Sequence, residues 1–348
     1  MPSHPIRQTT VVDPLPKAEL HLHLEGSIRP ETAVELAGRH GVRLTREEVR
    51  ARYEYSNFAG FIDAFKWVTS FLRDPEDYAL ITRRILEELT GQNVVYAEIT
   101  ISAGVMLLRG QSVEANFAAI REAAGSAALG RLRAAWIFDG VRQFGGEAVM
   151  AAAGCAVRLA GSGVVAFGMG GDELVHPAAE FRAAFDLARA AGLHIVCHAG
   201  ETGGPESVRE AVEILGAERI GHGIAVMHDE ALAESLAARG VALENCPTSN
   251  VCTGSLAQQT GKADATLADH PLAQLLEGGS LVTLSTDDPA MFHTDLLTEY
   301  SRAATLGLSD TQLVQLAERS FRAAFLPPGE RQRFLDDFHA AAKSAGLI

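Results

Sequence analysis

Eight short apolar runs, separated by longer stretches with helical periodicity, predict an α/β fold of the (β/α)8 TIM-barrel type. Parallel strands that are covered on both faces have near-continuous apolar sequences, and several of these runs have that pattern. The chain has 348 residues, of which 47% are hydrophobic, so it can bury one large core. We therefore expect a single barrel domain over residues 1–348.

The predicted strands follow one another along the chain with room for a helix between most of them. They are Glu19–Leu24, Val94–Ile101, Ala134–Asp139, Val164–Gly168, His194–His198, Arg219–His222, Val241–Cys246 and Leu281–Thr286. Predicted helices between them include Ala178–Ala191, Glu206–Leu215 and Glu230–Arg239. Glycines follow these helices where a left-handed residue often ends a helix, at positions 192, 216 and 240. The alternative of an open doubly wound sheet is disfavoured because no G-x-G-x-x-G follows the first strand.

Two segments depart from a plain barrel. Residues 26–93 are too long for one loop and one helix, and their aromatic residues recur at near-helical spacing. This insertion after the first strand predicts either a helical lid over the barrel mouth or a helix packed on the barrel, and we expect Phe58 and Phe61 to contact a ligand. Residues 254–269 are polar and rich in turn-forming residues, so we expect low order there. Thr311–Phe325 and Glu330–Ala345 are predicted to be C-terminal helices.

Residues that can bind a metal stand at or near the ends of the predicted strands. His21 and His23 alternate on the first strand, so both imidazoles point to the same face. His198 ends the fifth strand, His222 ends the sixth, and Asp287 follows the eighth. Because the carboxyl ends of all barrel strands open on one side, these residues are expected to converge there.

Each residue taken alone has a simpler explanation, such as a core histidine for His198 or a turn for Asp287 and Asp288. Together, on one predicted rim, they favour a metal site. Imidazole suits zinc, and catalytic zinc keeps a coordination position for water. One Zn²⁺ per chain, beside a water of lowered pKa, could therefore be held by His21, His23, His198 and Asp287.

Three further residues could carry out proton transfers at such a site. Glu201, three residues after His198, is a candidate acid that places a proton on a ring nitrogen. His222 could take or orient the proton of the water, and Asp288 could hold a purine N7 or its proton. Other histidines, such as His270, lack this context and are predicted to be structural or on the surface.

The sequence resembles the adenosine and adenine deaminases of the amidohydrolase superfamily, in the family's order and over nearly the whole chain. The matching blocks are LPKAELHLHLEGS at 15–27, GGDE at 170–173, HAGE at 198–201, GHG at 221–223, CPTSN at 246–250 and STDDP at 285–289. As a set these blocks are highly specific, whereas none is specific alone. The resemblance implies a barrel that hydrolytically deaminates a 6-aminopurine.

The resemblance also implies roles for the residues. It implies one zinc held by His21, His23, His198 and Asp287. It implies that Glu201 protonates N1, that His222 is the base for the zinc water and that Asp288 contacts N7. The backbone at Gly171 is implied to contact N3. Members with two metals usually bridge them with a modified lysine after the fourth strand, and the residues at 168–172 contain no lysine.

The positions that select the substrate resemble different branches of the family. Members that act on adenosine usually carry Asp at the position of Glu25, where the carboxylate meets the ribose 5′-hydroxyl, so Glu25 resembles the adenine and aminodeoxyfutalosine deaminases. Gly171, Asp172 and the GHG block around His222 are similar to the nucleoside branch. We expect deamination of adenosine or of a 5′-modified adenosine such as aminodeoxyfutalosine. The alternatives are a free adenine deaminase and a purine- or metal-binding barrel without turnover, which the presence of Glu201 and His222 disfavours.

Composition argues against several other classes of function. The net charge of −14 disfavours binding to nucleic acid, and the P-C-x-x-C half of the zinc site in base-flipping deaminases is absent. No stretch approaches the about 18 apolar residues of a membrane span, and no secretory signal is seen. The sparse cysteines are typical of buried free thiols in a reducing cytoplasm. A small purine nucleoside is thus the expected partner, and the oligomeric state is left open.

Overall fold

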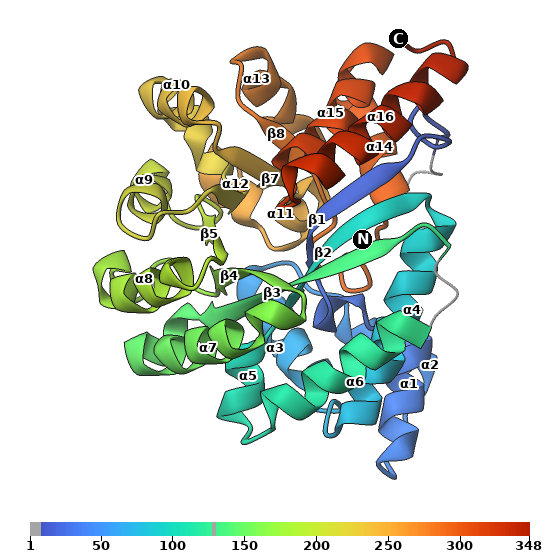
Figure 1. Cartoon of the computed structure of the whole chain (residues 1–348), viewed down its shortest axis with the longest axis vertical. Helices are drawn as coiled ribbons and strands as arrows, with labels where there is room; N and C mark the ends of the chain where they lie inside the picture. Colours follow the sequence, from blue (N-terminus) through green and yellow to red (C-terminus); the bar gives the residue numbers. More distant parts are fainter. Residues whose placement is uncertain (1–7, 127–129) are drawn as a thin grey trace.

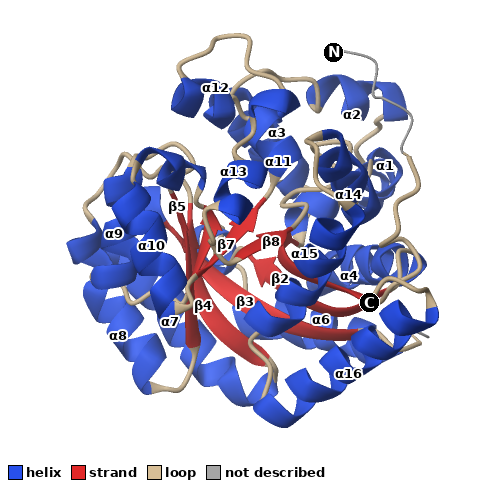
Figure 2. Cartoon of the chain, turned by 90° about the horizontal axis from the view of Figure 1, so that it is seen from above, coloured by secondary structure: helices blue, strands red, loops and turns tan. Residues whose placement is uncertain are grey.

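The computed structural model describes residues 8–126 and 130–348, and it confirms the predicted barrel. Its strands are β1 Lys17–His23, β2 Val94–Ile101, β3 Arg133–Val141, β4 Val164–Gly170, β5 His194–Ala199, β6 Arg219–His222, β7 Ala242–Asn245 and β8 Val282–Leu284. Each strand pairs in parallel with the next, in the order β1 to β8. A parallel bridge between Leu22 and Asp287 joins the segment after β8 to β1. Figure 2 shows the strands in the centre, surrounded by helices.

The predicted strands agree with the structure, and two of them have the predicted bounds. β7 and β8 are shorter than predicted because the chain turns early at their carboxyl ends. Pro247 begins a helix after β7, and Asp287 adopts a left-handed φ of 66° shortly after β8. These early turns place the residues that follow at the mouth of the barrel.

The helices surround the barrel and are labelled in Figure 1. The α-helices are α1 Pro30–Arg39, α2 Arg46–Arg52, α3 Phe58–Thr69, α4 Pro75–Gly91, α5 Ala103–Leu108, α6 Val113–Ser126, α7 Gly145–Leu159, α8 Arg182–Ala190, α9 Pro205–Glu213, α10 Glu230–Arg239, α11 Pro247–Cys252, α12 Ser255–Thr260, α13 Leu272–Glu277, α14 Leu296–Thr305, α15 Asp310–Ala323 and α16 Pro328–Ser344. Short 3-10 turns are η1 Glu25–Ser27, η2 Arg142–Phe144, η3 Ala160–Ser162, η4 Ala178–Phe181, η5 Ile224–His228 and η6 Leu267–Asp269. Gly192, Gly216 and Gly240 have φ values of 83°, 76° and 69°, which confirms their predicted left-handed conformation.

The insertion between β1 and β2 contains α1 to α4, and α3 combines both predicted roles. Phe58 and Phe61 line a cavity at the barrel mouth, as a lid would. Trp67 and Phe71 instead pack edge to face against each other, with ring centroids 5.3 Å apart, and Phe71 is buried in the core. Helix α3 therefore covers the mouth with Phe58 and Phe61, and it is anchored by Trp67 and by Phe71, which follows its last turn.

The expectation of low order for residues 254–269 is wrong. Gly254, with a φ of 77°, precedes α12, and η6 closes the segment. The side-chain amides of Gln258 and Gln259 donate to the carbonyls of Thr202 and Gly203, so α12 is tied to the loop after β5. The turn-forming residues of this segment thus begin helices and make side-chain hydrogen bonds.

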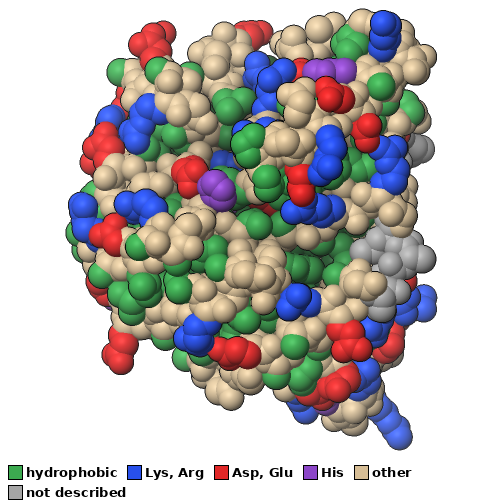
Figure 3. Space-filling view, viewed as in Figure 1, with side chains coloured by type: hydrophobic (Ala, Val, Ile, Leu, Met, Phe, Trp, Pro, Cys, Tyr) green, Lys and Arg blue, Asp and Glu red, His purple; other side chains and the backbone are tan. Residues whose placement is uncertain are grey.

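Acidic and basic side chains are interspersed on the face in Figure 3. No helix in the described ranges is long and apolar enough to cross a membrane. The four cysteines are free thiols, and all but Cys252 are buried.

Candidate active site

Two residues at the mouth of the barrel have backbone conformations that residues other than glycine seldom adopt. His222, which ends β6, has a φ of 63°, and Asp287 has a φ of 66°. The backbone of Asp287 is held because its N–H donates to the His21 carbonyl (2.9 Å) and its carbonyl accepts from the His23 N–H (2.8 Å). Such conformations cost of order 1–3 kcal/mol and cluster at functional sites. Here they turn both side chains towards the barrel axis.

The structure brings the predicted metal ligands together. The Oδ1 atom of Asp287 lies 3.5 Å from His21 Nε2 and 3.3 Å from His23 Nε2. The ring centroids of His198 and His21 are 4.6 Å apart. One donor atom from each of the three histidines lies within 4.8 Å of the others, a spacing that one ion can bridge. His21 Nε2 is buried without a hydrogen-bond partner among the described residues, as a metal-directed nitrogen would be.

The protonation states of these side chains fit cation binding. Burial lowers the pKa of His198 well below its usual range and that of His23 to about 4, so both rings are neutral ligands. Burial also acts on His21, but the carboxylates of Asp287 and Glu244 outweigh it and raise the pKa to about 10. A metal ion would therefore displace a proton from His21. Burial opposes ionisation of Asp287, yet the neighbouring histidines hold its pKa well below the usual range.

A buried chain of charged side chains supports His21 from inside the barrel. His21 Nδ1 lies 2.8 Å from Oε2 of Glu244. Arg219, fully buried, lies 2.5 Å from both Glu244 and Glu98. Since Glu244 accepts a hydrogen bond from the Nδ1–H of His21, Nε2 is left for the metal, an arrangement that fixes the ring and strengthens it as a ligand.

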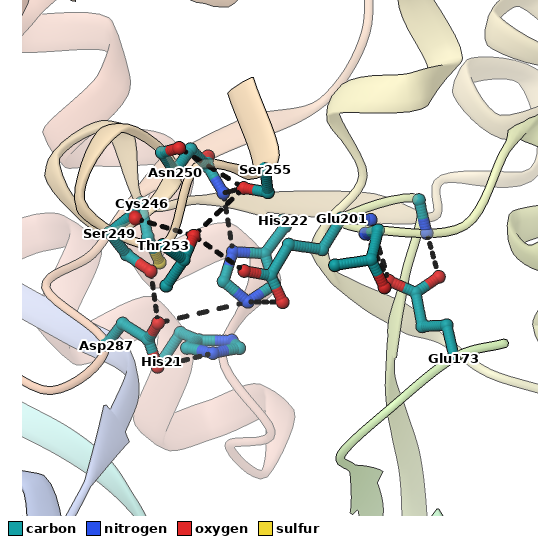
Figure 4. A network of polar contacts seen from close by, with 12 residues as sticks. His21, Glu173, Glu201, His222, Cys246, Ser249, Asn250, Thr253, Ser255 and Asp287 are labelled. Carbon is teal, nitrogen blue, oxygen red and sulfur yellow. Dashed lines mark hydrogen bonds and ion pairs between the residues drawn. The ribbon is translucent and has the colours of Figure 1, made fainter. Parts of the chain in front are cut away.

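Glu201 lies in a turn that Glu173 organises (Figure 4). The Glu173 carboxylate accepts hydrogen bonds from the backbone N–H groups of Gly200, Glu201 and Thr202, at 2.7, 2.8 and 2.9 Å, and from the hydroxyl of Ser207. Glu201 Oε2 lies 3.5 Å from His222 Nε2. Burial raises the pKa of Glu201 to about 8, with further contributions from Asp287 and Glu173, so Glu201 is a neutral acid at neutral pH.

His222 is the end of a hydrogen-bonded chain that fixes its tautomer. The N–H of Leu272 donates to Nδ1 of His270, so His270 carries its proton on Nε2 and donates it to Oδ1 of Asn250 (3.1 Å). The amide of Asn250 then donates to Nδ1 of His222 (3.2 Å). His222 consequently carries its proton on Nε2, the nitrogen that faces Glu201. His270 is structural, as predicted, but it acts on the site through Asn250.

Asp288 faces the same space from the segment after β8. Burial, reinforced by the neighbouring Asp287, raises the pKa of Asp288 well above its usual range, so this carboxyl is protonated. Its Oδ1 atom is buried with no hydrogen-bond partner in residues 8–126 and 130–348. A Cβ at Gly26 would lie 1.7 Å from this atom, so only glycine fits beside it. Asp288 therefore presents to the cavity a fixed carboxyl oxygen that no described residue satisfies.

These groups open on one cavity of about 280 Å³. Its walls include the predicted residues His23, His198, Glu201, His222, Asp287, Asp288, Gly171, Phe58 and Phe61. His21 lies beneath them, in the barrel. Glu25 does not line the cavity, because it is buried and its Oε1 atom accepts from the backbone N–H of Ser102 (3.0 Å).

Sequence reasoning assigned no role to several supporting residues. Glu244 and Arg219 stand as charged residues within predicted strands, which was a signal of paired burial. Asn250 and Glu173 lie within the family-like blocks, but only the fold shows what they contact. Asp139, a buried carboxyl that lines the cavity at β3, also received no role.

The comparisons with known proteins agree with this geometry. The family model described as adenosine deaminase matches residues 16–341. Aminodeoxyfutalosine deaminase of Streptomyces coelicolor is 40% identical over 331 residues, which cover 93% of this chain and 83% of the relative. Adenine deaminase of Rhizobium leguminosarum is 36% identical and covers 92% of this chain and 98% of the relative.

Solved structures resemble the fold over nearly its whole length. Adenine deaminase of Arthrobacter aurescens superposes with a TM-score of 0.86 at 29% identity and covers 94% of this chain and 99% of its own. An amidohydrolase from Burkholderia ambifaria with bound Zn has a TM-score of 0.86 at 25% identity and covers 97% and 94%. The family model matches residues 16–341, which include the barrel strands and the site. The chain therefore belongs to the adenosine deaminase family.

Proposed function

We propose that this protein is a zinc-dependent hydrolase that converts the 6-amino group of adenosine, or of a 5′-modified adenosine, to a 6-oxo group with release of ammonia. One observation carries the proposal. Two buried, protonated carboxyls, Glu201 and Asp288, face the same cavity as the imidazole and carboxylate cluster. The ring nitrogens of a purine accept hydrogen bonds, so neutral acids are complementary to them where carboxylates would repel them.

The ligand set favours zinc. Three imidazoles and one carboxylate, from His21, His23, His198 and Asp287, are donors that zinc prefers, and the Zn-containing relative supports this choice. When bound, zinc supplies a Lewis acid and a water nucleophile of lowered pKa. We assign one ion to each chain, because no lysine is present at residues 168–172 to bridge a second.

The protein side chains move the protons. Glu201 donates its proton to N1 as the oxygen of water bonds to C6, which prevents negative charge from building up on the ring. Asp287 is the ionised carboxylate at the site and accepts the proton that the water loses. The resemblance implied that His222 is the base for the water. Because the hydrogen bonds of His222 place its proton on Nε2, we assign it instead to orient the water. Asp287 then returns its proton to the amino nitrogen, the C6–N bond breaks with release of ammonia, and the hydroxyl on C6 gives its proton back to Glu201 as the 6-oxo group forms.

The remaining wall positions the purine and its substituent. Asp288 donates to N7, and the backbone at Gly171 approaches N3. Phe58 and Phe61 supply an apolar wall from α3. Glu25 does not reach the cavity but accepts a hydrogen bond from the backbone of Ser102, which lines it. Free adenine is the rival substrate, which the similarity to adenine deaminases favours.

The test is a spectrophotometric screen of zinc-loaded protein with adenosine, 2′-deoxyadenosine, adenine, 5′-methylthioadenosine and aminodeoxyfutalosine. Turnover of a nucleoside that is lost on metal removal and restored by zinc supports the proposal. Turnover of adenine alone would favour the rival. Glu201→Gln is expected to keep the metal and lose most activity, and full activity in that variant would remove Glu201 from the mechanism. A protein that binds zinc but deaminates none of these compounds would be a binding barrel.

A further inference from the structure

One buried carboxyl on the wall of the cavity takes no part in the proposed chemistry. Asp139 lies near the end of β3, and strand alternation turns Ile137, Asp139 and Val141 towards the barrel interior. Val141 lines the cavity, Ile137 lines a smaller space beneath it, and Asp139 borders both. Asp139 is 5% exposed, so its carboxyl is set into the barrel and does not belong to the outer surface.

This carboxyl lacks a partner of its own. The Oδ1 atom of Asp139 is buried, and no group in residues 8–126 and 130–348 hydrogen-bonds to it. An enclosed polar atom without a partner is costly, so a ligand that satisfies it gains affinity. Asp139 is also absent from the groups of described residues whose donor atoms are close enough to share a metal ion. A part of the substrate is therefore the partner that Asp139 fits.

The backbone beside Asp139 leaves room for a ligand. Gly170, which ends β4, has no side chain. A Cβ at this position would lie 3.4 Å from Oδ2 of Asp139 and 3.6 Å from Nε2 of His198. The space in front of Gly170 thus opens between the carboxyl and a ring of the metal cluster, and a substrate atom that reaches it approaches Asp139 closely.

The order of the strands indicates which part of a nucleoside meets Asp139. In the proposed function, N1 faces Glu201 after β5 and N7 faces Asp288 after β8, one on each side of C6. Since the strands are ordered β1 to β8 around the barrel, the edge of the purine opposite C6 faces β1 to β4. N3 is on the N1 side of the ring, so it faces β4 and β3, where Asp139 stands. In the anti conformation usual for purine nucleosides, the 2′-hydroxyl lies on the N3 side of the sugar.

A hydroxyl also suits Asp139 chemically. A hydroxyl group both donates and accepts hydrogen bonds, so it can pair with either oxygen of a carboxyl. Burial, with a contribution from Glu25, raises the pKa of Asp139 well above its usual range, so the carboxyl is neutral. A neutral carboxyl is complementary to an uncharged polar group and not to a cation.

We propose that Asp139 hydrogen-bonds the 2′-hydroxyl of the substrate ribose, so that the enzyme prefers ribonucleosides to 2′-deoxyribonucleosides. The proposal rests on the proposed function, since it names another part of the same nucleoside. A site with a buried polar group rejects an analogue that lacks the matching hydroxyl, because the protein group is left unpaired. Asp139 is thus a specificity-determining residue, and its removal affects recognition of the sugar and not proton transfer to the purine.

The first test compares adenosine with 2′-deoxyadenosine and 3′-deoxyadenosine on the zinc-loaded enzyme. Loss of the 2′-hydroxyl is expected to lower kcat/KM roughly tenfold or more, and loss of the 3′-hydroxyl to lower it less. Equal values for adenosine and 2′-deoxyadenosine would overturn the proposal. A larger loss with 3′-deoxyadenosine would also overturn it, because the contact would then lie on the other hydroxyl.

Variants then locate the contact. In Asp139→Ala, the preference for adenosine over 2′-deoxyadenosine is expected to fall to within about threefold, mainly through a higher KM for adenosine. Asp139→Asn keeps a hydrogen-bonding group in place and is expected to retain part of the preference. Glu147→Gln, at an exposed carboxylate on α7 outside the cavity, is the matched control and should keep the full preference.

A structural role for Asp139 gives a different result. The smaller space beneath the cavity measures about 10 Å³, about the room that one water needs, and Asp139 could hold such a water. Asp139→Ala would then lose activity equally on both nucleosides, and this outcome would overturn the proposal. A thermal melt checks that the variant is folded, and the comparison of nucleosides on the unsubstituted enzyme does not depend on it.

Failure of this inference can be separated from failure of the proposed function. If adenosine and 2′-deoxyadenosine are deaminated equally well, the reaction stands and only the contact of Asp139 is wrong. Binding of the two nucleosides to Glu201→Gln protein, measured by calorimetry, does not depend on turnover. Tighter binding of adenosine is expected there, and equal affinity for the two nucleosides would overturn the proposal even if no compound were deaminated.

Discussion

The Glu173→Gln substitution tests whether the turn that carries Glu201 is set by a single carboxylate. Glutamine has the same shape, so no cavity is created. Its oxygen can still accept from Glu201 and Thr202, but its NH₂ group faces the N–H of Gly200, which keeps only its 2.8 Å bond to the Ser207 hydroxyl. Hydrogen bonds to charged groups contribute about 1.5–3 kcal/mol and neutral ones about 0.5–1.5, so two weakened bonds and one lost bond cost about 3.5–6 kcal/mol.

The expected result is a fall in kcat of about tenfold to a hundredfold, since each 1.4 kcal/mol of misplacement of Glu201 costs about tenfold and part of the loss appears as lower stability. Metal content should be unchanged, because Glu173 contacts the turn after His198 and not the ligand atoms. The assay is steady-state deamination with metal analysis and a thermal melt. Glu206→Gln, an exposed carboxylate on α9 with a side chain 73% exposed, is the control.

The pH profile supplies a readout that a purely structural effect would not move. Glu201 acts as a proton donor, so activity should be present below its raised pKa of about 8 and be lost as the pH rises through it. The negative charge of Glu173 contributes to that elevation. Removing the charge lowers the pKa of Glu201, so the alkaline limb should shift to lower pH in Glu173→Gln. An unshifted limb together with unchanged kcat would refute the assignment.

Further predictions concern the metal cluster. Glu244→Gln should weaken metal affinity about 10- to 100-fold in a chelator competition, because His21 loses its charged hydrogen-bond acceptor. Unchanged affinity would show that Glu244 does not tune the ligand. Gly221→Ala should abolish metal binding and turnover together while the far-UV circular dichroism is kept, since its Cβ would lie 2.6 Å from His21 Cε1. Gly38→Ala, with no atom within 4 Å of the new Cβ, should leave both unchanged. Chelation of the metal should lower Tm as well as activity, and added zinc should restore both, because a bound ion stabilises the folded state.

The barrel and its metal cluster could be predicted because both depend on patterns local to the sequence. Buried parallel strands are apolar throughout, and strand alternation places His21 and His23 on one face. Strand ends were less predictable, since they depend on turns such as the left-handed φ at Asp287. The substrate contact expected of Glu25 was inferred from a motif, whereas the fold directs this side chain to the backbone of Ser102.

The supporting networks could not be predicted because their members are distant in sequence. Arg219 lies between Glu98 and Glu244, and nothing local indicates that these three charges meet inside the barrel. His270 reaches His222 only through Asn250. Removing one member of a buried pair leaves an unpaired charge at a cost of about 3–5 kcal/mol, so such sets must be retained together.

Some residues of the site are held by buried contacts at strand ends, and others are exposed on helices at the mouth of the cavity. This difference indicates where substrate preference can change. The residues that we propose to act on the amine stand at strand ends and are held by buried hydrogen bonds and ion pairs, so a substitution there is expected to disturb metal binding, proton transfer and stability at once. Lys66 and Arg109 stand on or after helices at the mouth, exposed and bonded only to α3. A substitution of these two residues is expected to change one wall of the cavity while the strand ends stay as they are. Differences in substrate among proteins with this barrel should therefore be sought in α3 and α5 before they are sought among the metal ligands.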